Sequence, residues 1–541
     1  MSKRLMRPTV ICFVCGLAIA ACAPKTPVAS APSPDLRARD RLAAADQDLL
    51  AGCLDCMTAA FRKYDALRSI PTTADAAAGG AVRAAALIAL RERELGMTDS
   101  GYLGKAREIL LASPNVPAWL DRIVDIVDAV SFASIGAGRP TTDADLERSR
   151  VMRINYQAWT AMLRETAEYD EAAAYTYLSL TCNASETRNL TRDQLLEPAE
   201  TFADAPLLKY RTALCRGTDG EKLRALLTAD ARFVEVTYFL GGLETTPRPG
   251  MVRMTGPAMD AAMAWYQRGY GWHPKWPVLT ITMANLDMTA EEFDAAVKLF
   301  DETLSYEPAA VDALLGKAKA LTFLGKNEEA IAAVDVLLPL GWYRGDGLYW
   351  RALNETQLER YEAGWTDIEL ANKLLLNAAV PKLAGIIAYR RKDLDVARTK
   401  FELSRTRNPN DCETGYYLGT VLAEQRAWSA TADVLKETAG CLESAIADLG
   451  QQILEIKASN DRPERIARQV AKRESQIVEA RREKVQSSFN VAVASFNLAR
   501  KDEARAWAGK VVDDEQFGER ARDLLSRLRK RSAKASRSGR L

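Results

Sequence analysis

Cysteine is the residue type in this chain that offers the most chemistry. Cys53 and Cys56 form a Cys-x-x-Cys, the spacing of redox-active thiols and of half a zinc site. A redox role needs a strand-helix setting and zinc needs two further ligands nearby, and the surrounding sequence predicts neither. Cysteines three residues apart lie on the same side of a helix, so the sequence favours a local disulfide or two buried thiols.

Other residues that could support catalysis are sparse. The chain has one histidine, His273, which excludes metal sites built from several histidines. No Gly-x-Ser-x-Gly motif accompanies it, and the segment 101–105 (GYLGK) does not have the spacing of a phosphate-binding loop. We therefore predict that the protein is not an enzyme and uses neither a metal nor another cofactor.

The first residues indicate export. Three basic residues precede an uncharged run over residues 8–21 that ends in small residues, so residues 1–21 have the three parts of a signal peptide. The run is shorter than the roughly 20 apolar residues that a membrane-spanning helix needs. The tetrapeptide Ile19-Ala20-Ala21-Cys22 resembles the bacterial lipobox.

This resemblance implies that Cys22 carries a diacylglycerol and an acyl chain such as palmitate. The alternative is an ordinary signal peptide with an incidental Cys22. Ala23 follows the cysteine, and the sorting habit of such lipoproteins then favours the outer membrane in a cell with two membranes. Residues 22–36 are rich in proline and alanine, a composition that stays extended, and would serve as a tether.

The rest of the chain is helical in composition. About 500 residues remain, which is more than one compact core and indicates several domains or a solenoid. Alanine is abundant, and no run of alternating strands with hairpin turns is evident. The formal charge is +1, from 73 basic and 72 acidic residues, so no overall field attracts nucleic acid. We predict an all-α fold, an α-solenoid, without a nucleic-acid partner.

Small residues recur with a bulky apolar residue four positions later. The first members of six such pairs lie 34, 34, 34, 33 and 34 residues apart. The pairs are Ala262/Tyr266, Ala296/Phe300, Ala330/Val334, Gly364/Ile368, Ala397/Phe401 and Thr431/Leu435. This pattern resembles the tetratricopeptide repeat (TPR), a 34-residue helix-turn-helix unit. The small residue lets two helices approach closely, and stacked units bury the face that one unit cannot.

The resemblance and the composition together divide the chain. Pro274, Pro308 and Pro409 each lie twelve residues past a small position, where the second helix of a unit is expected to end. The charged stretch after Cys441 is interpreted as a solvated helix, with a docking arm as the alternative. The predicted divisions are a signal peptide (1–21), a tether (22–36), a divergent helical-repeat domain (37–228), a TPR array of about six units (229–441), a charged helical extension with a degenerate repeat (442–526) and a basic disordered tail (527–541).

Six cysteines remain after the signal peptide and Cys22, an even number suited to an exported protein. Cys412 and Cys441 occupy the first and thirtieth positions of one repeat, where the two helices of the hairpin lie side by side. We expect these two to be bonded. Cys182 and Cys215 both end predicted helices and are the second candidate pair, and Cys53 with Cys56 is the third.

Binding is predicted from the array. In TPR proteins the first helix of each unit lines a concave groove, and its positions carried over to this sequence give Phe323, Tyr349, Lys382, Tyr389, Arg390, Tyr416 and Glu424. Tyrosine mixed with both signs of charge suits a peptide or protein surface, although any one of these residues could merely solvate the groove. We expect a lipid-anchored scaffold or assembly factor of the cell envelope with a protein partner. The alternative is a carbohydrate- or polymer-binding envelope lipoprotein, with Trp272, Trp276 and Trp342 as its platform.

Overall fold

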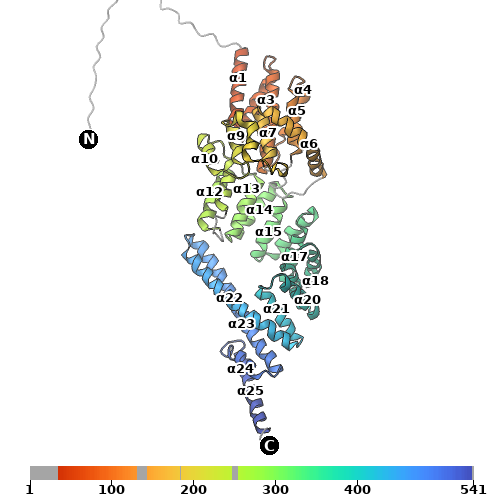
Figure 1. Ribbon diagram of the computed structural model, residues 1–541, viewed down its shortest axis with the longest axis vertical. Coiled ribbons are helices and arrows are strands. Elements are labelled where there is room, and N and C mark those ends of the chain that lie inside the picture. Colours follow the sequence, from red (N-terminus) through yellow and green to blue (C-terminus); the bar gives the residue numbers. More distant parts are fainter. Residues whose placement is uncertain (1–33, 131–142, 183, 247–253, 539–541) are drawn as a thin grey trace, which may run out of the picture.

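The structure is a computed structural model that describes residues 34–130, 143–182, 184–246 and 254–538. Within these ranges the chain forms helices and no strand, which confirms the all-α prediction. Figure 1 shows an elongated molecule that runs from α1 at one end to α25 at the other. The signal peptide, Cys22 and the tether as far as residue 33 lie outside the described residues.

The N-terminal part is a compact group of short helices. They are α1 (Pro34–Ala51), α2 (Leu54–Leu67), α3 (Ala74–Leu95), α4 (Tyr102–Ala112), α5 (Ala118–Ala129), α6 (Asp143–Ala167), α7 (Glu171–Thr181), η1 (Ser185–Thr187), α8 (Arg192–Leu196), η2 (Glu197–Phe202), α9 (Pro206–Ala213) and α10 (Gly220–Ala229). Alanine lines most of α3, so this helix is buried over nearly its whole length and its neighbours pack close to it.

A buried arginine joins this group to the array. The guanidinium of Arg91 on α3 pairs with Glu235 at 2.7 Å and donates to the Tyr175 hydroxyl at 2.8 Å and the Gly52 carbonyl at 3.3 Å. The ring of Tyr210 lies 3.6 Å from its central carbon. A buried ion pair is tolerated when its remaining donors are bonded, as they are here. Glu235 immediately precedes α11, so the pair connects α3 to the first repeat.

The apolar core does not divide where the sequence places a boundary. One cluster of buried side chains runs from Ala45 to Ala290 and includes residues on both sides of position 228. Trp276, which is fully buried, donates from its indole nitrogen to the Leu95 carbonyl at 2.7 Å. The N-terminal helices and the first repeats therefore share one interior.

The array consists of helix pairs. They are α11 (Val236–Thr245) with α12 (Gly256–Trp272), α13 (Pro277–Thr289) with α14 (Phe293–Tyr306), α15 (Val311–Phe323) with α16 (Asn327–Leu337), α17 (Arg344–Gln357) with α18 (Tyr361–Leu374), α19 (Ala379–Arg390) with α20 (Leu394–Arg407), and α21 (Cys412–Glu424) with the start of α22 (Trp428–Ala458). A short η3 (Leu338–Leu340) follows α16. Helices α12, α14 and α20 each end two residues before the prolines that the sequence marks as helix ends.

The turn inside each of the last five helix pairs has the same backbone geometry. One residue in each of these turns adopts the left-handed conformation, and it lies two residues after the end of the first helix. These residues are Glu291 (φ 60°), Gly325 (φ 71°), Glu359 (φ 60°), Lys392 (φ 66°) and Arg426 (φ 59°). They lie 34, 34, 33 and 34 residues apart, so the backbone carries the same period as the small and large side chains.

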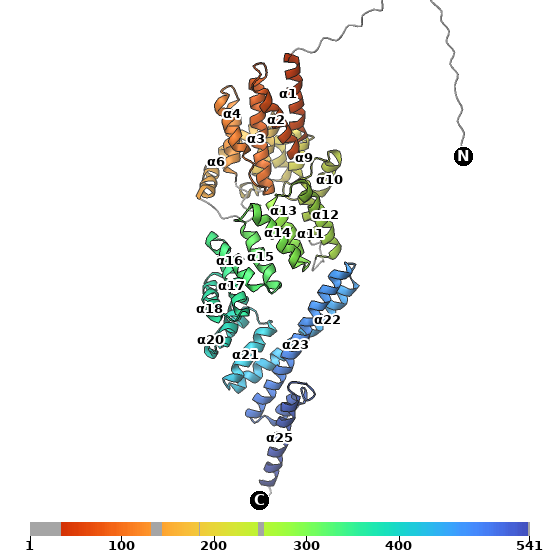
Figure 2. The same cartoon turned by 180° about the vertical axis from the view of Figure 1, so that it is seen from behind.

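The second helix of the last repeat does not end at Cys441. No proline or glycine cap follows that residue, and α22 continues to Ala458 before the chain turns into α23 (Pro463–Asn497). The two helices pack antiparallel, and both views show them running back toward α12 (Figure 1, Figure 2). Residues 442–486 are called the arm below, and residues 459–465 its tip. The boundary predicted at 441/442 lies inside a continuous helix.

The C-terminal end is helical rather than disordered. After α24 (Lys501–Gly509), helix α25 spans Gly518–Ser538, whereas the sequence predicts disorder from residue 527. Ala521, Leu524 and Leu528 are buried at helical spacing, and Leu524 packs against Ala492 and Ala508. This apolar stripe forms the helix, which then continues into the basic residues.

Each of the three candidate cysteine pairs is joined by a disulfide in the structure: Cys53–Cys56, Cys182–Cys215 and Cys412–Cys441. The Cys182–Cys215 bond links the end of α7 to the segment after α9. The Cys412–Cys441 bond closes the last helix pair at the base of the arm. These two bonds therefore join separate helices, at sequence separations of 33 and 29 residues.

The left-handed turn positions lead to a stability prediction. Replacing Arg426 with Gly removes a side chain from a conformation that L-residues disfavour, so we expect the free energy of unfolding to rise by about 0.5–1 kcal/mol. Gly325→Ala should lower it by about 1 kcal/mol. Urea unfolding followed by circular dichroism measures both changes. Arg426→Ala is the control, because it removes the same side chain and keeps the strain. A decrease in stability for Arg426→Gly would contradict the assignment.

Candidate functional site

The first helices of the repeats present the residues that the sequence assigns to a concave groove. Neighbouring first helices contact one another through side chains about one repeat apart. Lys382 on α19 pairs with Glu413 on α21 at 2.8 Å, and Tyr389 donates to Glu424 at 2.6 Å. These contacts place residues from α19 and α21 on one continuous face, which we call the groove face.

The lysine of the groove face is held by two carboxylates. Lys382 Nζ lies 2.8 Å from Glu413 and 3.1 Å from Asp411. Burial alone would lower the pKa of Lys382, but these two carboxylates outweigh it and raise that pKa to about 12. Tyr349 on α17 is half-buried beside this group, and its desolvation raises the pKa of the phenol. The lysine therefore stays charged at any physiological pH.

The other predicted groove residues are Tyr416, Arg390 and Phe323. Tyr416 on α21 is half-buried and donates to Gln486 of the arm at 2.8 Å. Arg390 is exposed beside Tyr416 and Tyr417. Burial raises the pKa of both phenols, and the charge of Arg390 offsets part of that rise. Phe323 lies at the end of α15, is 54% exposed, and stacks on Phe293 with ring centres 5.0 Å apart.

An aromatic cluster connects Phe323 to the groove face. The Trp350 ring lies 6.0 Å from Phe323 and 5.6 Å from Tyr349, edge to face in both cases. Lys319 Nζ lies 5.9 Å from the Trp350 ring centre, within range of a cation–π interaction. The sequence analysis did not include Trp350, although its position next to Tyr349 is a signal that could have identified it.

The arm adds charged residues that the sequence analysis also missed. Glu483 on α23 faces Glu413 and Asp411 of α21. Its burial, followed by the repulsion from Glu413, raises the pKa of its carboxyl to about 7. The arm thus completes one side of the groove face with a side chain whose charge changes near neutral pH.

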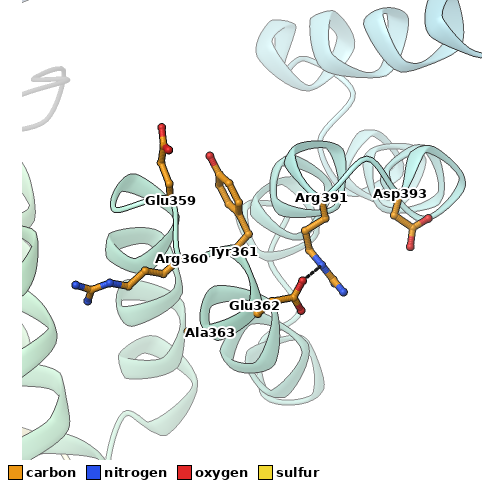
Figure 3. A pocket seen from close by; sticks show the side chains of 7 residues that line it. All are labelled: Glu359, Arg360, Tyr361, Glu362, Ala363, Arg391 and Asp393. Atoms are coloured by element: carbon orange, nitrogen blue, oxygen red, sulfur yellow. Dashed lines mark hydrogen bonds and ion pairs between the residues drawn. The ribbon is translucent and has the colours of Figure 1, made fainter.

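A second hollow lies at the turns rather than on the groove face. Its volume is about 690 Å³, and Figure 3 shows its lining side chains at the start of α18 and at the α19–α20 turn. Glu362 accepts from Arg391 at 2.9 Å, and Arg360 pairs with Glu328 of the preceding repeat. These two ion pairs hold the turns of adjacent repeats together.

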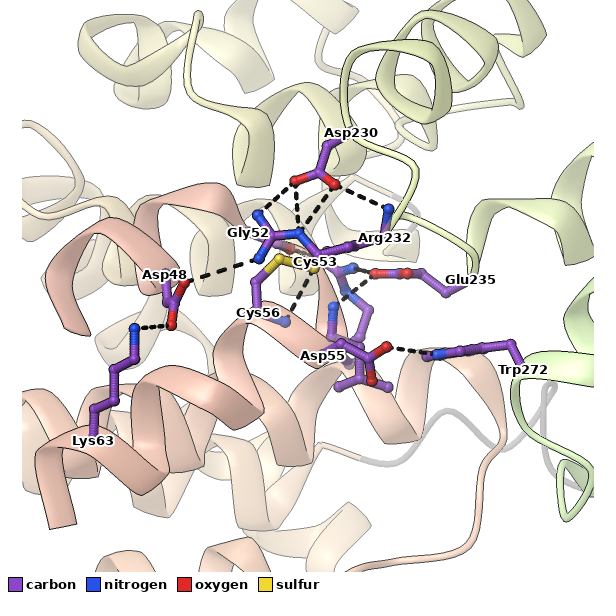
Figure 4. The surroundings of a disulfide bond; sticks show 12 residues. Asp48, Gly52, Cys53, Asp55, Cys56, Lys63, Asp230, Arg232, Glu235 and Trp272 are labelled. Atoms are coloured by element: carbon purple, nitrogen blue, oxygen red, sulfur yellow. Dashed lines mark hydrogen bonds and ion pairs between the residues drawn. A yellow bond between two sulfur atoms is a disulfide. The ribbon is translucent and has the colours of Figure 1, made fainter. Parts of the chain in front are cut away.

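The Cys-x-x-Cys lies deep in the N-terminal core. Figure 4 shows Cys53 and Cys56 beside Glu235, Asp55 and Trp272, with the disulfide at the first turn of α2. Both sulfur-bearing residues are 0% exposed. A redox-active disulfide must be reachable by another thiol, and this one is not. Its position indicates a structural bond.

Two of the three tryptophans proposed as a carbohydrate platform, Trp272 and Trp276, pack in the core, whereas Trp342 is 38% exposed. Trp276 is fully buried, and Trp272 donates to Asp55 at 2.8 Å and packs edge to face against Trp276. Sugar binding needs an open aromatic face, which Trp276 lacks. Burial lowers the pKa of His273, which caps the end of α12. Within the described ranges no group of three or more His, Cys, Asp or Glu side chains has a metal-binding arrangement.

The described helices were also compared with the requirements for a membrane-spanning helix. None of them combines the length and the apolar character that crossing a bilayer requires.

Comparison with known proteins gives one sequence match and several structural ones. The tetratricopeptide repeat family matches residues 287–352, from the end of α13 into α17. No curated protein matches the chain. YrrB, described as a TPR protein with an unusual peptide-binding site, is 19% identical, with 32% of this chain and 91% of its own covered and a TM-score of 0.29. A tetratricopeptide repeat protein from Parabacteroides merdae is 16% identical, with 50% and 93% covered and a TM-score of 0.28. The Cut9–Hcn1 hetero-tetramer is 13% identical, with 92% and 96% covered and a TM-score of 0.37.

The helix pairs, their stacking and their shared turn geometry define an α-solenoid of the kind that binds other proteins. The matched segment contains two of the five left-handed turns that repeat through the array. The chain therefore contains tetratricopeptide repeats, with the family match at residues 287–352.

The pKa of Glu483 predicts a pH-dependent stability change. Its folded-state pKa of about 7 lies above the unfolded value, so the penalty for ionising it is absent at low pH, grows as the pH rises, and is complete above 7. Glu483→Gln removes that penalty. We expect the variant to be more stable than the wild type by about 1 kcal/mol at pH 8, after allowing for partial exposure, and nearly equal at pH 5.

Urea unfolding at the two pH values measures this difference. Glu474→Gln, at an exposed position on the same helix, is the control and should not differ from the wild type at either pH. A constant difference for Glu483→Gln across pH would show that its carboxyl does not titrate as assigned.

Proposed function

We propose that the protein is a scaffold of the bacterial cell envelope that binds a peptide segment of a protein partner on its groove face. The observation that carries this proposal is the face formed by Tyr349, Lys382, Tyr389, Arg390 and Tyr416, which come from three successive first helices of the array. Regular helices hold these side chains at fixed spacing, so the site is largely preformed.

The chemistry of the groove face fits a peptide better than a small apolar ligand. Tyrosines supply apolar area with a polar end, and the paired charges supply donors and acceptors for a backbone. Arg390 is the exposed cation of the face, and its guanidinium can bond a carboxylate through two parallel hydrogen bonds. We therefore expect a segment that carries at least one acidic residue and one aromatic or aliphatic anchor.

The location forms a second part of the proposal. The signal peptide and the likeness of residues 19–22 to a lipobox support lipid attachment at Cys22. Three disulfides are stable in an oxidising compartment and are rare in a reducing one, which supports export. Acyl chains at Cys22 would hold the protein at a membrane surface while the array faces its partner.

A site-specific photo-crosslinker tests the groove. It replaces Arg390 in cells, and the matched control replaces Arg398, which is exposed on the second helix α20. We expect one protein to be captured repeatedly from position 390 and not from position 398. Equal capture at the two positions, or recovery of glycan only, argues against the proposed site.

Charge reversal then tests the chemistry with the purified protein and the captured segment. Arg390→Glu should weaken binding at least tenfold, because it replaces an attractive contact with a repulsive one, while Arg398→Glu should leave it unchanged. Isothermal titration calorimetry measures both. Because both side chains are exposed, neither change should alter the melting temperature by more than a degree or two. Unchanged affinity for Arg390→Glu would exclude this face.

Lipid attachment is tested by metabolic labelling with an alkyne fatty acid. We expect label on the wild-type protein and none on Cys22→Ser, because only a thiol at this position can form the thioether. Cys15→Ser, within the predicted signal peptide, is the control and should remain labelled in its mature form. Label that persists in Cys22→Ser would place the lipid elsewhere or show that none is attached at Cys22.

A further inference from the structure

The arm returns to the other end of the array. Helix α22 leaves the last repeat, and α23 runs back along it, so the tip at residues 459–465 reaches the start of α12. In both overall views the end of the α22–α23 hairpin lies beside α12 (Figure 1, Figure 2). Two hundred residues separate the partners in sequence, so this contact is independent of the repeat-to-repeat packing.

The tip fits closely on the first turn of α12. The side chain of Asp461 lies against Gly256, the first residue of that helix, and a Cβ at this position would collide with its carboxylate. Arg465, which is 4% exposed, pairs with Asp461 at 2.5 Å and with Asp260 at 2.9 Å. Arg462 also pairs with Asp260 at 2.9 Å. A side chain at position 256 would therefore displace the Asp461 carboxylate from its docked position.

A second row of ion pairs follows along α23. Arg468 pairs with Glu292 at 2.7 Å, and Lys472 pairs with Glu291 at 2.7 Å. Arg473 lies 3.7 Å from Glu291. The basic residues 465, 468 and 472 are spaced three and four apart, so they share one face of the helix and meet the α13–α14 turn together.

The contact at the tip is ionic and has no apolar core. The apolar clusters that contain residues of α12, α13 and α14 include no arm side chain among the described residues. A hollow of about 400 Å³ remains between the tip and these helices, with Met259, Met263 and Met283 in its lining. The pairs of Arg462, Arg468 and Lys472 are partly exposed, and such pairs hold less firmly than the close-packed joints between repeats.

The other end of the arm is fixed to the array. Tyr416 on α21 bonds Gln486 of α23, and α22 is itself the second helix of the last repeat. The arm therefore contacts the array at two places, at α21 and at the α12–α14 end, and the array and the arm together form a ring. From Lys472 to Gln486 the arm extends about 20 Å at 1.5 Å per residue, more than the roughly 10 Å diameter of one helix. In both views the ribbon of the α22–α23 hairpin lies apart from those of α15 and α17 (Figure 1, Figure 2).

We propose that the arm is a releasable clasp that closes the groove face into a ring. When the tip is docked on α12, a segment on the groove face is enclosed between the array and the arm. When the ion pairs at Asp260, Glu291 and Glu292 break, the ring opens at the tip and the arm stays attached at α21. An internal segment of a folded partner enters and leaves only through the open form. This inference rests on the proposed function, because it concerns access to the same face.

Hydrogen–deuterium exchange of the full-length protein without any ligand tests the clasp. We expect Gly256→Ala to accelerate exchange of the amides in residues 459–470 at least tenfold, because the new methyl group displaces Asp461. Gly271→Ala is the matched control in the same helix, since no atom lies within 4 Å of a Cβ at that position. Amides of α15 to α21 should exchange as in the wild type.

The second test measures exchange at the tip after an ion pair is removed and after the salt concentration is raised. Asp260→Asn removes the partner of Arg462 and Arg465, and Asp301→Asn removes an exposed pair with Lys317 on the same array as a control. The first should accelerate exchange at the tip and the second should not. Raising the salt from 0.15 M to 1 M, where the Debye length falls from about 8 Å to about 3 Å, should open the wild-type clasp in the same way. If Gly256→Ala unfolds α12, the Asp260→Asn result decides the question.

The clasp proposal is wrong if the tip amides exchange as slowly as those of the array core in both variants and at high salt. That result would identify the arm as a fixed brace. This result would leave the crosslinking test at Arg390 unaffected, because no partner takes part in the exchange experiment. Conversely, a clasp that opens as expected while position 390 captures nothing would separate the motion from the proposed binding function.

Discussion

The fold depends on close approach between helices at small residues. A Cβ at Gly241 would collide with the ring of Tyr266, and one at Gly385 would collide with the ring of Phe401. In both pairs the glycine lies on the first helix and the ring on the second helix of one unit. The large residue fills the space that the missing side chain leaves, which fixes the distance and the register of the two helices. The position of every groove residue follows from this register, because each first helix is held by the helix behind it.

The sequence predicted this part of the fold because the constraint recurs. Ala296 with Phe300 and Ala397 with Phe401 are buried as the pattern requires, and the prolines mark helix ends. The arm was predicted as a solvated charged helix, with a docking arm as the alternative, and its partners could not be predicted because its contacts have no period. Asp260 and Arg465 are 205 residues apart, and a single ion pair leaves no trace in composition. The tail was predicted as disordered because its charge outweighs an apolar stripe of only three residues.

The groove residues were predicted by transferring ligand-facing positions of TPR proteins to this sequence, and that transfer was only partly informative. The positions identified which side chains would share a face, and Lys382, Tyr389 and Tyr416 do form contacts between successive elements. They could not show that these polar groups are already bonded within the chain. A partner must therefore exchange existing hydrogen bonds for new ones, and such exchange rewards a ligand whose donors and acceptors match the site. Specificity is then expected to exceed what the modest apolar area of the face would provide.

The Arg91–Glu235 pair has a consequence for how the molecule unfolds. Repeat proteins often lose structure one unit at a time, because each unit contacts only its neighbours. Here a fully buried charge on α3 is neutralised by a residue at the entry to the first repeat, and both lie in one continuous core. If the helices around either partner melted alone, the other charge would remain buried and uncompensated. The N-terminal helices and the first repeats are thus coupled as one cooperative unit.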